Sequence, residues 1–138
     1  MIDQLLLSTV MVVITVTIHG AGIAGLARAL RFDPTNVEAH HHFTPRHAIL
    51  ILAIVLALFT LHGIEIWLYA ALYEALNAVA DLEAAVYFST ITYAGIGFDD
   101  DEMAHRWRLV SAIEGVNGII LLGWSTAFFV TVVARLRH

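Results

Sequence analysis

Three long apolar segments constrain the fold of this chain more than any other feature of its sequence. They cover about residues 2–30, 47–72 and 109–133. Each is at least as long as the roughly 20 residues that an α-helix needs to cross a bilayer. The first lacks the basic start of a signal peptide and is too long for its apolar region, so it is predicted to be a mature helix. The sequence therefore predicts an all-α membrane protein with three transmembrane helices.

The composition agrees with this class and excludes others. Hydrophobic residues make up 59% of the 138 residues, charged residues make up 14%, and mean hydropathy is +0.79. A soluble domain usually has about 25% charged residues. The chain has no cysteine, which excludes disulfides and thiolate chemistry. Its net charge is −5 and it has no lysine, so no nucleic-acid partner is expected, because such a partner requires a basic face.

Arginines predict the orientation in the membrane. Five of them lie beside the loop between the first two segments or follow the third segment: Arg28, Arg31, Arg46, Arg135 and Arg137. The positive-inside rule places both groups in the cytoplasm, with the N-terminus outside and the C-terminus cytoplasmic. Arg106 and Arg108 lie on the opposite side and run against the rule. The inner (plasma) membrane of a prokaryote is the expected location.

The loop of residues 31–47 contains three adjacent histidines, His40, His41 and His42. Such a run could bind a metal ion or respond to pH. A solvated loop at the membrane surface is the plainer interpretation of the same residues.

A helix too short to cross a membrane is predicted between the second and third segments. Asp81 is a good N-cap, and residues 82–92 (LEAAVYFSTIT) then give about 16 Å of helix at 1.5 Å per residue. Gly95 and Gly97 end it. Irregular backbone at membrane depth is tolerated only where protein buries it or where it lines a watery cavity. One chain of this size cannot enclose such a cavity, so the sequence predicts a re-entrant pore helix and loop, completed by several copies.

This region resembles the pore domain of the tetrameric potassium-channel superfamily, specifically the small bacterial type with two transmembrane helices. The resemblance covers about residues 49–136. It is carried by YFSTITYAGIGFDD (87–100) and EGVNGIILLGWSTAFF (114–129). The family has an aromatic pore helix, then Thr-x-Thr-Thr-Val-Gly-Tyr/Phe-Gly-Asp, then an inner helix that contains glycine. The resemblance implies a homotetramer with a pore domain at 47–138 and an added helix and cytoplasmic loop at 1–46.

An ungapped alignment with that pattern implies the position of the selectivity filter. It places Thr92 on the first Thr, Gly97 on the first filter Gly and Phe98 on the Tyr/Phe. The filter residues would be Thr92, Gly95, Ile96, Gly97, Phe98 and Asp99. A register shifted by one residue instead places Gly95 and Gly97 on the two filter glycines, at the expense of the closing Asp. In the inner helix, Gly118 and Gly123 fall where such helices often bend.

The filter departs from the family at two positions. Gly95 replaces the Thr whose hydroxyl forms the innermost ion site, and Asp99 replaces the second Gly. Filters replace ion hydration with backbone carbonyls, and glycine supplies the positive φ that this requires. A ring of Asp99, with Asp100, Asp101 and Glu102 at the pore mouth, would instead select cations by charge. The implied permeant ion is K⁺ or Na⁺, and strict K⁺ selectivity does not follow. An ordinary turn and a solvated helix start are the plainer interpretations of these residues.

Four ionisable side chains fall within the predicted spans, where such groups are costly and mark candidate functional sites: His19, His62, Glu65 and Glu114. His62 and Glu65 are three residues apart and share a helix face, and His19 lies at a similar depth. Two histidines and a carboxylate suit Zn²⁺ or a similar divalent ion. Alternatively, Glu65 only accepts hydrogen bonds from a histidine and holds the added helix in place. Glu114 could reach this group or brace the pore helix from behind.

The leading functional hypothesis is a homotetrameric channel in membrane lipid that conducts monovalent cations passively. The alternative is a non-conducting membrane sensor or metal-binding protein that uses His19, His62 and Glu65. A proton-coupled transporter is weaker, because the sequence has no inverted repeat. No enzymatic activity is expected, since Ser89, Ser111 and Ser125 lack convincing His or Asp partners in the sequence and there is no phosphate-binding loop.

Overall fold

The computed structural model describes residues 1–30, 45–97 and 103–136. Its elements are α1 (Ile2–Ala29), α2 (Pro45–Ala75), α3 (Leu82–Tyr93), the 3₁₀ turn η1 (His105–Trp107) and α4 (Arg108–Leu136). The described residues contain no strand. Three helical stretches, α1, α2 and η1 with α4, are long and apolar enough to cross a membrane. The predicted all-α membrane fold with three transmembrane helices is therefore confirmed.

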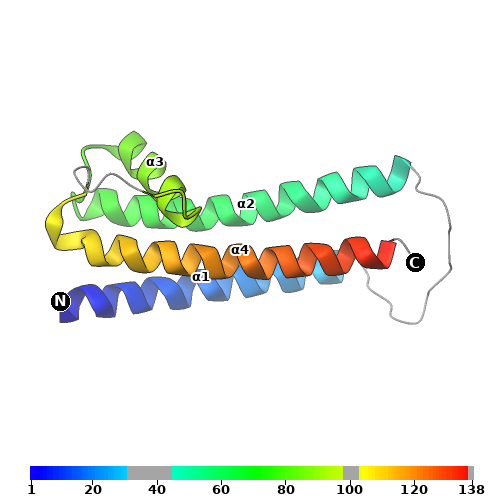
Figure 1. Ribbon diagram of the computed structural model, residues 1–138, viewed down its shortest axis with the longest axis horizontal. Helices are drawn as coiled ribbons and strands as arrows, with labels where there is room; N and C mark the ends of the chain where they lie inside the picture. The colour runs from blue at the N-terminus through cyan, green and yellow to red at the C-terminus, as the bar shows by residue number, and fades with distance from the viewer. Residues whose placement is uncertain (31–44, 98–102, 137–138) are drawn as a thin grey trace.

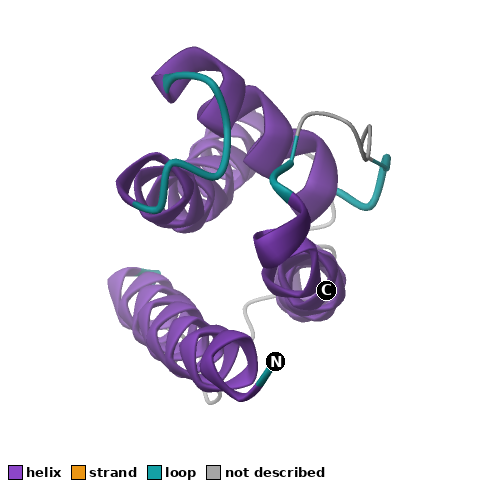
Figure 2. Cartoon of the chain, turned by 90° about the vertical axis from the view of Figure 1, so that its left-hand side faces the viewer, coloured by secondary structure: helices purple, strands orange, loops and turns teal. Residues whose placement is uncertain are grey.

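The three long helices lie side by side along the long axis of the molecule (Figure 1). α1 and α4 run in the same direction, and α2 runs in the opposite direction. The N-terminus and α3 therefore share one end of the bundle, and the C-terminus lies at the other end. Viewed from that first end, α3 lies across α2 and α4, with both of which it is in contact (Figure 2). α1 contacts α2 and α4 from the other side.

α3 is the short helix that the sequence predicts. The side chain of Asp81 caps it by accepting a hydrogen bond of 2.9 Å from the amide of Ala84. Its 12 residues span about 18 Å, which is much less than the roughly 30 Å of a bilayer core. In Figure 1, α3 begins near the end of the bundle and runs toward its middle. The chain thus enters the bundle part of the way and turns back.

Two apolar clusters separated by a polar layer form the core. One cluster is built around Tyr69, Tyr73 and Phe88, with the Tyr73 and Phe88 rings packed edge to face at 5.7 Å. The other is built from Ile23, Ile54, Leu58 and Val132. Between them along the helices lie buried polar side chains, which include Thr15, His19, Glu65, Glu114, Asn117 and Ser125. Buried polar groups need partners, so this layer is where the helices hold one another most specifically.

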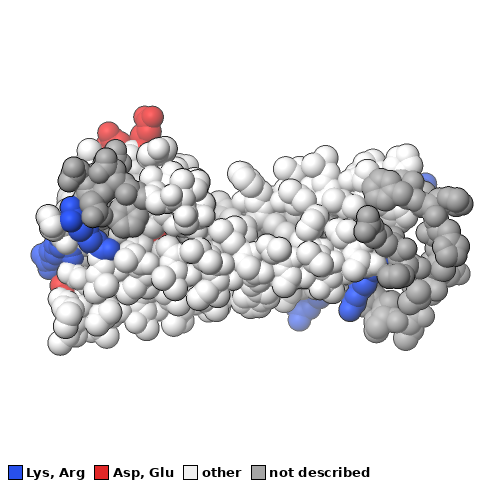
Figure 3. All heavy atoms as spheres, viewed as in Figure 1, with Lys and Arg blue, Asp and Glu red and all other residues white. Residues whose placement is uncertain are grey.

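The surface agrees with insertion in a membrane. On the face shown in Figure 3, charged side chains gather at the two ends of the bundle, and the surface between them carries none. Many large apolar side chains along the three long helices are exposed to the surroundings in the single chain. An uncharged, apolar middle is what the bilayer core requires.

Candidate functional site

The carboxyl end of α3 finishes in a glycine-dependent turn. The amide of Gly95 donates to the carbonyl of Thr92, and the amide of Ile96 donates to the carbonyl of Ile91, both at 3.0 Å. This pair of bonds, with φ +70° at Gly95, is a Schellman motif, which ends a helix through a residue of positive φ. Gly97 also has positive φ, +112°, and no atom of the described residues within 4 Å would meet a Cβ placed there. Its glycine requirement is therefore conformational and not steric.

Two glycines of α4 let the end of α3 approach the backbone closely. A Cβ on Gly118 would lie 2.2 Å from the carbonyl oxygen of Tyr93, and one on Gly115 would lie 3.3 Å from that of Thr92. Gly123 has open space around it. α4 is one continuous helix through both predicted bend positions, so Gly118 has a packing role in this structure and the bending of α4 stays a prediction.

The structure describes only some of the filter residues that the sequence predicts. The side chain of Thr92 is buried, and its hydroxyl has no hydrogen-bond partner among the described residues. Residues 95–97 are exposed in the single chain, with Ile96 at 76%. The remaining predicted positions lie outside the described residues: Phe98, Asp99, Asp100, Asp101 and Glu102. The histidines of the 31–47 loop, His40 to His42, also lie outside them.

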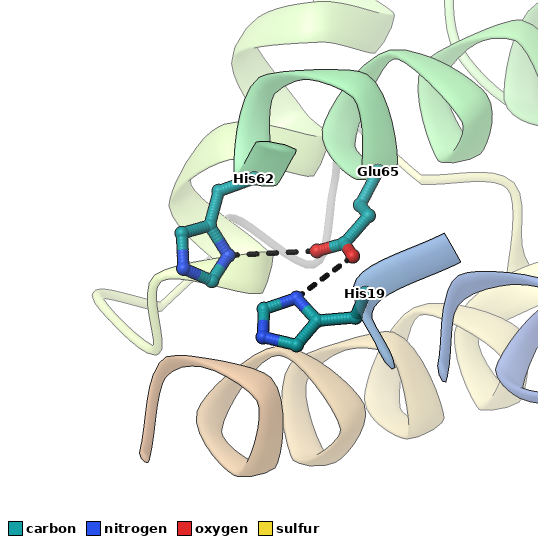
Figure 4. A group of neighbouring side chains, drawn as sticks. All are labelled: His19, His62 and Glu65. Carbon is teal, nitrogen blue, oxygen red and sulfur yellow. Dashed lines mark hydrogen bonds and ion pairs between the residues drawn. The ribbon is translucent and has the colours of Figure 1, made fainter. Parts of the chain in front are cut away.

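Glu65 is the centre of a buried polar cluster. His19 Nδ1 lies 2.9 Å from one oxygen of its carboxylate, and His62 Nδ1 lies 3.5 Å from the other. Figure 4 shows both rings turned toward the carboxylate, His62 from the same helix and His19 from α1. The side chains of His19 and Glu65 are wholly buried, and that of His62 is 12% exposed. The two histidines and the glutamate that the sequence singles out thus meet at one point.

The same cluster reaches all four helices. The hydroxyl of Tyr93, the last residue of α3, donates to Glu65 Oε2 and lies 3.0 Å from His62 Nδ1. On the other side, His19 Nε2 lies 3.1 Å from the hydroxyl of Ser125 in α4. The cluster therefore connects α1 to the point where α3 ends.

Glycines of α1 bring that helix close to its neighbours at this level. A Cβ on Gly22 would lie 2.6 Å from the side chain of Leu61, and one on Gly20 would lie 3.3 Å from Trp124. Small residues at such positions allow membrane helices to pack closely. Gly25, the next glycine of α1, has open space around it, so close helix contact rests on Gly20 and Gly22.

Glu114 belongs to a second group of polar side chains, which contacts α3. Its carboxylate accepts hydrogen bonds from the hydroxyls of Tyr73 in α2 and Ser89 in α3. The Ser89 hydroxyl also lies 3.1 Å from the carbonyl of Ile66. Among the described residues, the set of side chains that could together hold a metal ion is His19, His62 and Glu65, without Glu114. Glu114 therefore braces α3, the second of the two roles that its position allows.

Tyrosine hydroxyls are the functional groups that sequence reasoning missed. Tyr93 links Glu65 to His62, and Tyr69 lies 3.4 Å from the amide nitrogen of Asn117. One pattern in the sequence could have indicated part of this. Glu65, Tyr69 and Tyr73 are spaced four residues apart, so they form one stripe along α2. A carboxylate and two phenols on one face of an apolar helix indicate a buried hydrogen-bonded layer.

One comparison with known proteins supports the class. Residues 48–135 match a family model described as "Ion channel". No curated protein and no solved structure matches the chain. The matched segment begins just inside α2, ends one residue before the end of α4, and leaves α1 outside it. The match covers well over half of the chain, so this integral membrane protein belongs to the ion channel family.

Proposed function

We propose that this protein is a homotetrameric channel that conducts monovalent cations passively, with residues 92–99 forming the narrow part of the pore. The observation that carries the proposal is the path of the chain around α3. This short helix ends inside the bundle, packs against α4, and is followed by Gly95 and Gly97, both of positive φ. A filter built from backbone carbonyls needs such a turn at membrane depth, where the backbone can face the ion.

Exposure of this turn is the reason for proposing several copies. Gly95, Ile96 and Gly97 are exposed in the single chain. Backbone without helical hydrogen bonds is too costly in lipid, so it must be covered by protein or lie beside water. Four copies around an axis would place the turns face to face and enclose water between them. One chain supplies only a quarter of that ring.

The charges at the turn favour cations. The carboxyl end of α3 carries the negative end of its helix dipole and points toward the bundle middle, as do its copies in a tetramer. Four consecutive acids, at 99–102, follow the turn in the sequence. Rings of carboxylates attract cations without selecting strongly between K⁺ and Na⁺. Because Gly95 and Asp99 depart from the potassium-channel pattern, we propose monovalent cation conduction without strict K⁺ selectivity.

The proposed orientation has the N-terminus and the acids outside and the C-terminus in the cytoplasm of a prokaryotic cell. The described arginines Arg28, Arg46 and Arg135 lie at the helix ends next to the proposed cytoplasmic side, and Arg106 and Arg108 lie at the opposite end. In the whole sequence, five of the seven arginines fall on the proposed cytoplasmic side, which is the excess that the positive-inside rule requires.

A flux assay with matched glycine variants tests the proposal. Purified protein in liposomes with an outward K⁺ or Na⁺ gradient is compared with Gly97→Ala and Gly25→Ala. Alanine is strained at the positive φ of Gly97, and both sites have open space for a methyl group. We expect flux from the native chain and from Gly25→Ala, and at least a tenfold loss in Gly97→Ala. Equal flux from Gly97→Ala, or a strictly monomeric protein by native mass spectrometry, would contradict the proposal.

The polar cluster around Glu65 favours a second candidate, a non-conducting membrane sensor. Three ionisable side chains gathered in the interior of a membrane protein are a functional hypothesis by default. Absence of flux from the folded native protein with K⁺, Na⁺ or divalent ions would favour this candidate over the channel.

A further inference from the structure

We propose that His19, His62 and Glu65 bind a divalent transition-metal ion, such as Zn²⁺, and that the ion competes with the Tyr93 hydroxyl for its ligand atoms. This inference goes beyond the proposed channel function, because binding of the ion can be measured without any ion flux.

The donor set has the chemistry that Zn²⁺ prefers. It offers two imidazole nitrogens and a carboxylate oxygen, the combination found in many zinc sites with an open fourth position. These three ligand atoms all lie within 4.8 Å of one another. His19 Nδ1 lies 2.9 Å from Glu65 Oε1, and His62 Nδ1 lies 3.5 Å from the other carboxylate oxygen, Oε2. Ligands about 2.1 Å from a tetrahedral zinc lie about 3.4 Å apart, so only small movements are needed.

The surroundings of the cluster favour a cation and hold the ligands in place. Glu65 and His19 are wholly buried at the level of the polar layer, where a positive partner stabilises a carboxylate. The hydroxyl of Ser125 contacts His19 Nε2 at 3.1 Å. That contact directs the opposite nitrogen, Nδ1, at Glu65, as outer partners of metal-bound histidines do.

Tyr93 connects this site to the turn after α3. Its hydroxyl donates to Glu65 Oε2 and lies 3.0 Å from His62 Nδ1. A metal ion bound to His62 Nδ1 would take the lone pair of that nitrogen, or replace its proton, and the nitrogen could then no longer form its hydrogen bond with the Tyr93 hydroxyl. Tyr93 is the last residue of α3, and its carbonyl lies against Gly118. Binding of the ion and the position of residues 94–97 are therefore coupled, and by linkage each affects the other.

Zinc titration of the full chain tests the site. The background variant has His40, His41 and His42 replaced by glutamine, because the loop histidines can bind zinc themselves. Isothermal calorimetry with Zn²⁺ alone, in detergent micelles, should give one ion per chain. Adding His62→Gln or Glu65→Gln should weaken binding at least tenfold. His105→Gln, at an exposed position in η1, is the matched control and should not change it. Helicity measured by circular dichroism shows which variants fold. If Glu65→Gln does not fold, the test uses His62→Gln, because His62 is partly exposed.

Tyr93→Phe tests the competition. Removing the hydroxyl frees His62 and Glu65, so this variant should bind Zn²⁺ several-fold more tightly than the background protein. Weaker binding would overturn the competition, because Tyr93 would then be a ligand. Binding that is unchanged by both His62→Gln and Glu65→Gln would overturn the site. Zinc binding without flux would support the zinc site and contradict the channel proposal. Flux without zinc binding would support the channel proposal and contradict the zinc site.

Discussion

Gly118 of α4 lies directly against the carbonyl oxygen of Tyr93, where α3 ends. A Cβ added at Gly118 would lie 2.2 Å from that oxygen, well inside van der Waals contact. The obstacle is backbone and not the end of a flexible side chain, so relief requires α3 or α4 to move. The absence of a side chain at Gly118 therefore allows α3 to pack this deeply against α4.

Gly118→Ala is accordingly expected to destabilise the protein, by about 1–3 kcal/mol, as overpacking of a close contact does. Gly123→Ala is the matched control in the same helix, since no atom within 4 Å would meet its methyl group. Thermal unfolding in detergent should show a lower melting temperature for Gly118→Ala and little change for Gly123→Ala. Equal melting temperatures for the two variants would mean that α3 and α4 do not meet as described.

Ser89→Ala tests the bracing of α3 by Glu114. The Ser89 hydroxyl donates to one oxygen of the buried carboxylate, and in the described structure Tyr73 is the partner of the other oxygen. An under-satisfied buried acceptor costs about 1–3 kcal/mol. Thr90→Ala, the exposed neighbour on α3, removes only a bond to its own helix. The melting temperature of Ser89→Ala should be well below that of Thr90→Ala. An equal decrease in both variants would show that the contact between Ser89 and Glu114 does not stabilise α3.

Local features of the sequence predicted the elements well. The spans follow from apolar length, and α3 follows from the Asp81 cap and the glycines after it, because capping and length depend only on nearby residues. The partner of Glu114 could not be predicted in this way. Which of two neighbouring groups it contacts depends on the rotation of α4 about its axis, and an almost uniformly apolar helix carries little information about that rotation.

The sequence does not distinguish the two alignments of Gly95 and Gly97 with the filter pattern, for a different physical reason. A helix-ending Schellman turn and a filter both require glycine at positive φ. Gly95 satisfies the first requirement in the described structure through its bond to the Thr92 carbonyl. Residue type therefore cannot distinguish a filter glycine from a capping glycine, and both registers remain compatible with Gly95 and Gly97.

Asp81→Ala tests whether the start of α3 contributes to stability. The aspartate side chain accepts from the amide of Ala84, and loss of an N-cap costs about 1 kcal/mol. Asp81→Asn keeps an acceptor of the same shape and should retain most of the native melting temperature. If Asp81→Asn and Asp81→Ala melt together and below the native protein, charge and not the capping bond is responsible.

The acids after the turn give a prediction about conduction that depends on salt. Neutralising them to amides should lower cation flux at low ionic strength, because carboxylates at a pore mouth concentrate cations around it. The positions are Asp99, Asp100, Asp101 and Glu102. At about 1 M salt the Debye length falls to about 3 Å, so the native and neutralised proteins should differ much less. Glu83→Gln, an exposed acid in the first turn of α3, is the single-charge control and should have a smaller effect. A loss of flux that is equally large at low and high salt would show that these side chains shape the pore and do not act through their charge.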